Sequence, residues 1–130
     1  MSPSAHILAS WLTAFPFHFA HRERRIISIA GVSPDIDGIG WLVDRAASLA
    51  GLETDYYSQY HHVIAHNVMA ALVISVVASA IARTRRRLVF VLSFLVVHLH
   101  FLFDVLGSRG PDGYQWPIVY LYPFSAQYEW

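Results

Sequence analysis

Residues 66–106 read HNVMAALVISVVASAIARTRRRLVFVLSFLVVHLHFLFDVL, and this stretch decides the fold. Residues 66–82 are nearly all apolar, an arginine-rich segment follows at 83–87, and residues 88–106 are again apolar apart from a few polar positions. The pattern predicts a helical hairpin with an arginine-rich turn. Each arm would span roughly 25 to 28 Å at 1.5 Å per residue, slightly short of the ~30 Å hydrocarbon core of a bilayer. A hairpin that crosses a membrane and one that is buried in a bundle are both open at this point.

The flanking sequence adds shorter helices. Apolar residues recur at helical spacing over residues 4–15, where Pro16 ends the run, and again over 26–32, where Ser33-Pro34 ends it. Residues 35–38 read as a turn, residues 39–52 hold a short helix, and the segment from Gly107 is rich in Gly, Pro, Tyr and Trp, which suits an ordered loop. We therefore expect an all-α fold: a single domain over residues 1–130, a compact bundle of about four to five helices with an irregular C-terminal tail.

The composition points to a membrane. Hydrophobic residues make up 55% of the chain and charged residues 14%, against about 25% charged in a typical soluble domain. A bilayer or a large homo-oligomeric interface must cover part of that surface, and we expect the cytoplasmic membrane of a bacterium or archaeon. In that membrane the arginine turn would face the cytoplasm. The net charge is zero, so no broad basic field exists to hold nucleic acid. No signal peptide is expected, because the N-terminus has no basic region before its apolar residues.

Histidines and carboxylates are the candidates for chemistry. The chain has eight histidines and no cysteine, so thiolate sites, disulfides and Fe–S clusters are excluded and a metal site must use nitrogen and oxygen ligands. His100 and Asp104 are four residues apart on a predicted helix and therefore share one face. A carboxylate at the C-terminal end of a helix is repelled by the negative end of the helix dipole. A metal or another cation beside Asp104 would remove this repulsion.

The predicted hairpin brings a second histidine to this pair. If the chain turns at residues 84–86, a residue at position n in one arm meets roughly position 170 minus n in the other. This places His66 beside Asp104, with His61 and His62 close by. Asp35 and Asp37 form a third element, a D-x-D turn between Pro34 and Gly38, although an ordinary turn or cap role is at least as common for such a pair.

Other polar residues are weaker candidates. Lone histidines on apolar helices are more often packed core residues than ligands, so His18, His21 and His98 are left out of the site. Arg109 and Asp112 lie just after the hairpin and suit contact with an anion and proton transfer, but ordinary loop roles are favoured for both.

The elements together resemble the membrane-bound metal-dependent hydrolase family. The resemblance rests on His6, Pro34-Asp35-Ile36-Asp37, His61-His62-Val63-Ile64-Ala65-His66-Asn67 and His100-Phe101-Leu102-Phe103-Asp104, followed by Trp116-Pro117 and Tyr122-Pro123-Phe124. The family pattern is an early His, then P-D-x-D, H-R-G-x-T-H-S and H-x-x-x-D. The order matches over nearly the whole chain, and the ligand style is similar to that of helical zinc-dependent phospholipase C enzymes.

The resemblance implies a set of metal ligands. They are His6, Asp35, Asp37, His61, His66, His100 and Asp104, with Asp37 and Asp104 as the catalytic carboxylates. So many ligands exceed one tetrahedral site, which implies two or more divalent ions, zinc by preference. The sequence departs from the family at His62, Val63, Ala65 and Asn67, which replace Arg, Gly, Thr and Ser. His61 and His66 would point apart on a regular helix, so His62 competes with His61 as the ligand.

These predictions together describe a metal-dependent hydrolase that activates water to cleave an ester, with a phosphoester or lipid-like ester as the favoured substrate. No organic cofactor is expected. Three alternatives stay open: a membrane protein that binds or transports metal without catalysis, a b-type haem protein that uses His66 with His98 or His100, and a structural helical subunit.

Overall fold

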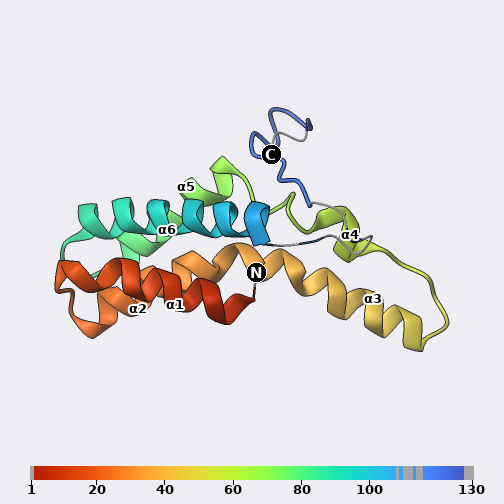
Figure 1. The fold of residues 1–130 in the computed structure, drawn as a ribbon, viewed down its shortest axis with the longest axis horizontal. Helices are drawn as coiled ribbons and strands as arrows, with labels where there is room; N and C mark the ends of the chain where they lie inside the picture. Colours follow the sequence, from red (N-terminus) through yellow and green to blue (C-terminus); the bar gives the residue numbers. More distant parts are fainter. Residues whose placement is uncertain (1, 108, 110–112, 114–115, 128–130) are drawn as a thin grey trace.

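The computed structural model describes residues 2–107, 109, 113 and 116–127, and within these residues the fold is all-α, as predicted. The helices, in chain order, are α1 (Pro3–Ala14), η1 (Phe15–Phe17), α2 (His21–Val32), η2 (Ser33–Ile39), α3 (Gly40–Leu49), α4 (Tyr56–Tyr60), α5 (Val68–Ile81) and α6 (Arg86–Gly107), where η marks a 3-10 helix. Figure 1 shows α1, α2, α5 and α6 side by side and α3 projecting beyond them.

The hairpin of the sequence analysis is present, with arms of unequal length. α5 has 14 residues and α6 has 22, so they span about 21 and 33 Å at 1.5 Å per residue. The first arm is shorter than the expected 66–82, because residues 66 and 67 precede the helix and Ala82 follows it. Buried Glu23 of α2 supports the turn between the arms, where its carboxylate accepts the backbone N–H groups of Arg83 and Thr84, each at 3.2 Å.

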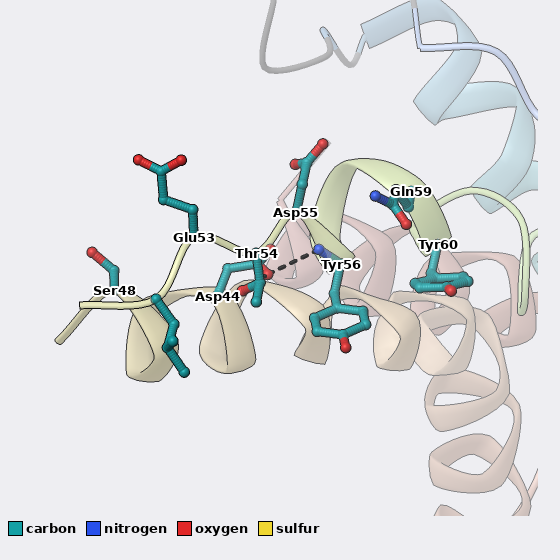
Figure 2. Close-up of a pocket in the computed structure, with 9 residues that line it drawn as sticks. Asp44, Ser48, Glu53, Thr54, Asp55, Tyr56, Gln59 and Tyr60 are labelled. Carbon is teal, nitrogen blue, oxygen red and sulfur yellow. Dashed lines mark hydrogen bonds between the residues drawn. The ribbon is translucent and has the colours of Figure 1, made fainter. Parts of the chain in front are cut away.

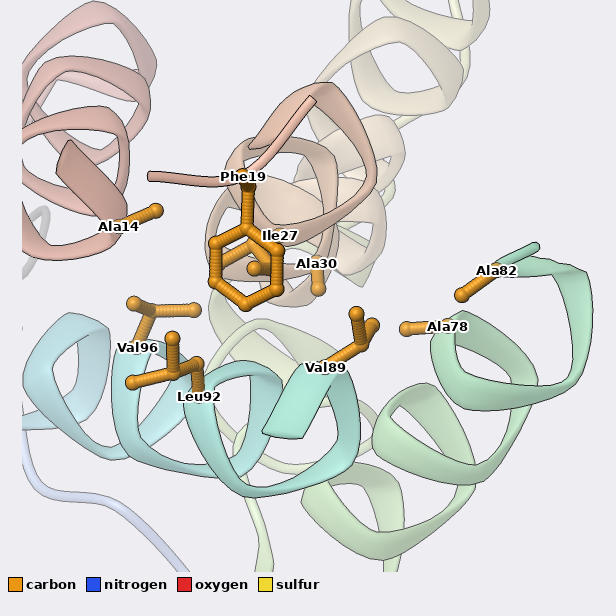
Figure 3. Close-up of a cluster of buried hydrophobic side chains, with 9 residues drawn as sticks. All are labelled: Ala14, Phe19, Ile27, Ala30, Ala78, Ala82, Val89, Leu92 and Val96. Carbon is orange, nitrogen blue, oxygen red and sulfur yellow. The ribbon is translucent and has the colours of Figure 1, made fainter. Parts of the chain in front are cut away.

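Small side chains bring the helices close together in the core. The main cluster of buried apolar residues lies where α1, α2, α5 and α6 meet and consists of Ala14, Phe19, Ile27, Ala30, Ala78, Ala82, Val89, Leu92 and Val96 (Figure 3). Alanines supply many of its contacts, as is usual where helices pack in membranes. Large apolar side chains such as Leu8, Ile29, Val73 and Val91 lie on the outside, each about half exposed or more. The molecule is therefore apolar on its outer face as well as inside.

Among the described residues, two helical segments are long and apolar enough to cross a bilayer. One is α6, and the other is the continuous run of α2, η2 and α3 over His21–Leu49; α5 is apolar but shorter. η2 replaces the turn that the sequence predicted at residues 35–38. Pro34 lacks the N–H that would continue α2 and its ring clashes with the preceding turn, so the backbone winds into a 3-10 helix there.

α4 is held against α3 by a carboxylate. Asp44 accepts hydrogen bonds from Thr54 Oγ1 at 2.7 Å and from the backbone N–H groups of Tyr56 and Tyr57 at 2.9 and 2.8 Å. Asp44 of α3 thus accepts N–H groups of the first turn of α4 that have no partner within α4 itself. Figure 2 shows this carboxylate beside Thr54 and Tyr56, in the wall of a surface pocket of ≈ 830 Å³. α4 in turn leads directly into the segment that carries His61, His62 and His66.

Candidate metal centre

The predicted ligands from distant parts of the chain meet at the C-terminal end of α6. The central contact joins His66, which lies just before α5, and His100 of α6: their Nε2 atoms are 3.1 Å apart. Asp104 Oδ2 lies 2.9 Å from His100 Nε2 and 3.5 Å from His66 Nε2. The antiparallel register of the hairpin therefore places His66 beside Asp104, as the sequence analysis predicted.

Each central histidine is oriented by a hydrogen bond at its other nitrogen. His100 Nδ1 donates to the backbone carbonyl of Gly31 at 2.8 Å, and His66 Nδ1 donates to Asp37 Oδ2 at 2.9 Å. Gly31 is one of the last residues of α2, where carbonyl groups lack partners within the helix. When both rings are neutral, each carries its single N–H on Nδ1, and the two Nε2 atoms then face each other with lone pairs. Metal-binding histidines are oriented in this way in proteins.

His6 and Asp35 complete this half of the cluster. His6 of α1 is fully buried, its ring stacks on that of His100 with centroids 3.7 Å apart, and its Nε2 lies 3.3 Å from Asp104 Oδ1. Its Nδ1 has no hydrogen-bond partner among the residues that the structure describes. Asp35 Oδ1 lies 3.6 Å from His100 Nε2. One potential ligand atom from each of His6, Asp35, His100 and Asp104 lies within 4.8 Å of the others.

Asp37 orients the other half of the cluster. Its carboxylate accepts the Nδ1–H of His61 at 2.6 Å, the Nδ1–H of His66 at 2.9 Å and the backbone N–H of Ala65 at 3.1 Å. Asp37, His61 and His66 also form a group compact enough to hold a metal ion. Asp35 and Asp37 thus contact different partners, because η2 turns their side chains in different directions. Direct ligation by Asp37 and its catalytic role stay predictions.

His62 is a residue that the ligand set left out. It has φ of 70°, is buried, and its Nδ1 donates to the backbone carbonyl of Trp116 at 3.1 Å. Burial, with the neighbouring His66 and His61, lowers the pKa of His62 to about 3, so the ring is neutral at physiological pH. His62, His66 and Asp104 form a further group of potential ligands. The expected conflict between His61 and His62 does not arise, because this segment is not helical and its side chains follow no helical period.

Positive charge is favoured at His66. Burial by itself lowers the pKa of His66, but its hydrogen bonds to Asp104 and Asp37 outweigh that effect and raise the pKa above its ordinary value. Nitrogen and carboxylate oxygen are also the donor set that suits zinc and similar divalent ions. The residues present therefore fit a metal centre with more than one ion.

Two aromatic residues outside the predicted ligand set cover His61. Tyr57 stacks on the His61 ring with centroids 4.8 Å apart, and Trp116 meets the same ring edge-on at 4.7 Å. Burial, and then the carboxylates of Asp35, Asp37 and Asp104, raise the pKa of Tyr57. Tyr57 could have been found from its position one helical turn before His61. The contact of Trp116 depends on the path of the tail and has no local signal.

The remaining candidates lie away from the cluster. His18 and His21 are exposed, so their interpretation as packed core residues was wrong: they lie in and beside the loop between η1 and α2. His98 fits that interpretation better, because its Nδ1 donates to the Phe94 carbonyl at 2.8 Å and its Nε2 lies 3.0 Å from the Tyr120 hydroxyl. Arg109 is exposed, and Asp112 lies outside the described residues.

Comparison with known proteins identifies the family of the chain. A family model described as YdjM inner membrane protein matches residues 1–130. No curated protein and no solved structure matches the chain. The description states a location and no reaction, and it agrees with the two apolar helical segments that are long enough to span a bilayer.

Proposed function

Because the chain belongs to the YdjM inner membrane protein family and lies in the membrane, we propose that it is a metal-dependent hydrolase acting on a phosphoester or lipid-like ester. The observation that carries this proposal is the contact between His66 Nε2 and His100 Nε2 at 3.1 Å, with Asp104 beside both. Lone pairs and a carboxylate that face one another in a buried site repel unless a cation lies among them.

Two overlapping sets of side chains would hold the ions. His6, Asp35, His100 and Asp104 form one set, and His62, His66 and Asp104 form the other, with Asp104 shared between them. Divalent ions bound there would acidify a water molecule and neutralise the oxygens of an ester during its displacement. Asp37 would keep His61 and His66 in place through the Nδ1–H groups that it accepts.

Asp35 supports hydrolysis over a purely structural metal site. Structural zinc sites are closed by protein ligands, whereas catalytic sites keep an open position. The Asp35 side chain is 18% exposed, whereas those of His100 and Asp104 are at most 3% exposed. Its Oδ2 atom is itself buried and has no hydrogen-bond partner among the described residues. We assign Asp35 Oδ2 to accept a proton from the attacking water. The oxygen of that water forms a new bond to phosphorus as the bond between phosphorus and the leaving oxygen breaks. The proton then passes from Asp35 to the leaving oxygen.

The alternatives differ in what they require of the same residues. In a transporter, the cluster would be a metal-binding site on a path through the bilayer. Such a protein would take up metal without hydrolysing an ester. A haem protein needs a flat slot between two axial histidines, whereas the space around His66 and His100 is taken by His6, His62 and Asp104. The packing thus favours ions over haem.

The test is metal content together with hydrolysis. The purified chain in detergent, loaded with zinc, should bind about two zinc ions and cleave p-nitrophenyl phosphate esters. His100→Ala and Asp104→Asn should lose metal and reduce kcat/KM by more than the roughly 10–100-fold that follows from loss of a supporting residue. His98→Ala, on the same helix but bonded to Tyr120, is the control and should retain both. Absence of bound metal in the wild-type chain, or metal uptake into vesicles without hydrolysis, would contradict the proposal.

A further inference from the structure

An apolar groove lies beside the candidate metal centre, between the η2–α3 segment and α4. Its volume is ≈ 390 Å³, and the residues that line it are Ile36, Asp37, Ile39, Gly40, Val43, Tyr56, Tyr60 and Ile64. Apart from Asp37, these lining residues are aliphatic residues, tyrosines and a glycine. Ile36, Ile39 and Ile64 are 72%, 61% and 55% exposed, so the groove is open to the surroundings of the protein.

The groove follows from local structure. Ile36, Ile39 and Val43 recur at spacings of three and four along a continuous helical run and therefore form one apolar stripe. Gly40 lets α4 lie directly against this run, because an added Cβ would come within 3.0 Å of the Tyr57 backbone nitrogen and 3.1 Å of the Tyr56 carbonyl carbon. Tyr56 and Tyr60 stack with ring centroids 5.9 Å apart and form the opposite wall.

Asp37 joins the groove to the metal centre. It belongs to the groove wall, and its carboxylate accepts the Nδ1–H groups of His61 and His66. A molecule in the groove would therefore lie against Asp37, whose side chain is 1% exposed and whose carboxylate faces the two histidines on its other side. Among the residues that the structure describes, no other charged side chain lines the groove.

We propose that this groove binds the alkyl or acyl chain of a phospholipid-like substrate and thereby delivers its phosphoester to the metal centre. The inference rests on the proposed hydrolase function and names the substrate class. Its occupant needs no hydrogen-bonding groups, because the walls offer little beyond two tyrosine hydroxyls. An extended peptide would leave its backbone N–H and C=O groups unpaired there, at considerable cost. A hydrocarbon chain has no such groups, and the bilayer around an inner membrane protein supplies it.

A groove-filling variant tests the proposal. Val43→Trp adds a large side chain at a groove residue that is 46% exposed and has no part in the metal centre. The matched control is Val73→Trp. Val73 is 58% exposed and lines a separate apolar groove of ≈ 210 Å³ between α2 and α5, which the tryptophan would fill. The substrates are dodecyl and ethyl p-nitrophenyl phosphate, compared in lipid nanodiscs.

The wild-type chain should show a KM at least about tenfold lower for the dodecyl ester than for the ethyl ester, since each buried methylene contributes ~0.8 kcal/mol. Val43→Trp should remove most of this difference by raising the KM of the dodecyl ester alone, and Val73→Trp should change neither KM. Equal KM values for both esters in the wild-type chain would overturn the proposal. So would an equal effect of Val43→Trp on both esters, or a dimer that Val43→Trp dissociates, which would assign the groove to a second copy.

A binding measurement separates this inference from the proposed function. Radiolabelled dodecylphosphonate, which cannot be hydrolysed, should bind the wild-type chain at least about tenfold more tightly than Val43→Trp, while ethylphosphonate should not distinguish them. If neither ester is cleaved, the hydrolase proposal fails and this measurement still decides the groove. Equal binding of dodecylphosphonate to both chains would overturn the groove as a chain-binding site.

Discussion

His66 Nε2 lies 3.1 Å from His100 Nε2, although 34 residues separate them in the sequence. The other nitrogen of each ring donates a hydrogen bond, to Asp37 from His66 and to the Gly31 carbonyl from His100. When both rings are neutral, the pair presents two lone pairs to one point inside the protein, and Asp104 adds a carboxylate oxygen there. A buried arrangement of this kind is stable only around positive charge, and most of the expected behaviour of the protein follows from it.

Removal of metal should destabilise the folded chain. Ligand binding to the native state alone stabilises it by about 2.7 kcal/mol when the free ligand is at 100 times its Kd. Treatment with a chelator should lower the midpoint of thermal unfolding in detergent by several degrees, and added zinc should restore it. His21→Ala, at an exposed histidine, should respond to the chelator as the wild-type chain does, whereas His100→Ala should not respond. A midpoint that is the same with and without chelator in the wild-type chain would contradict a resident metal.

His62 should matter more for metal content than His61. The His62 ring is neutral and fixed by Trp116, and it belongs to a group of potential ligands with His66 and Asp104. The group that contains His61 depends on Asp37, whose two oxygens already accept the Nδ1–H groups of His61 and His66. His62→Ala should therefore reduce the number of zinc ions bound per chain. His61→Ala should retain that number and weaken binding by roughly 10–100-fold, as expected for a supporting residue. Zinc titrations followed by elemental analysis distinguish the two; the reverse ranking would restore His61 as the direct ligand.

Asn67 should couple the histidine segment to α5. Its Oδ1 accepts the Ala70 N–H at 2.8 Å as an N-cap, and its Nδ2 donates to the Val63 and Ile64 carbonyls, each at 2.8 Å. Asn67→Ala should cost about 0.5–2 kcal/mol of unfolding free energy from the cap alone.

Asn67→Ser separates the two roles, because serine is also a good N-cap but lacks the amide that donates to the two carbonyls. It should be more stable than Asn67→Ala but bind zinc more weakly than the wild-type chain, since the segment with His62 and His66 is then less restrained. Denaturation curves and zinc titrations give the two readouts. Unchanged zinc affinity in both variants would show that the segment needs no support from Asn67.

Gly31 should tolerate no side chain. A Cβ at this position would lie 1.8 Å from Ser10 Oγ and 2.8 Å from Ser10 Cβ, because α1 and α2 cross closely there. Gly31→Ala should destabilise the chain by about 1–3 kcal/mol through overpacking, and it should disturb the carbonyl that orients His100.

The double variant Gly31→Ala with Ser10→Gly removes the clashing atoms and should recover part of both stability and zinc affinity. Thermal unfolding and zinc titration of the four chains of this cycle give the coupling between the two positions. Additive losses from the two substitutions would contradict the close contact as the cause.

The helices, and the relations between ligands that lie on them, could be predicted from the sequence. His100 and Asp104 share a face because they are four residues apart, and the antiparallel hairpin brings His66 to them by its register, so both relations follow from regular periods. His98, two residues from His100, points elsewhere for the same reason.

The arrangement of the remaining site residues depends on the tertiary structure. The 3-10 winding of η2 sets the different partners of Asp35 and Asp37, and the irregular path of residues 61–67 decides that His61, His62 and His66 all reach the cluster. The Gly31 and Trp116 carbonyls select which ring nitrogen of His100 and His62 remains available. Irregular backbone has no repeating geometry, so its side-chain directions depend on packing against segments that are distant in the chain, and no local pattern records them.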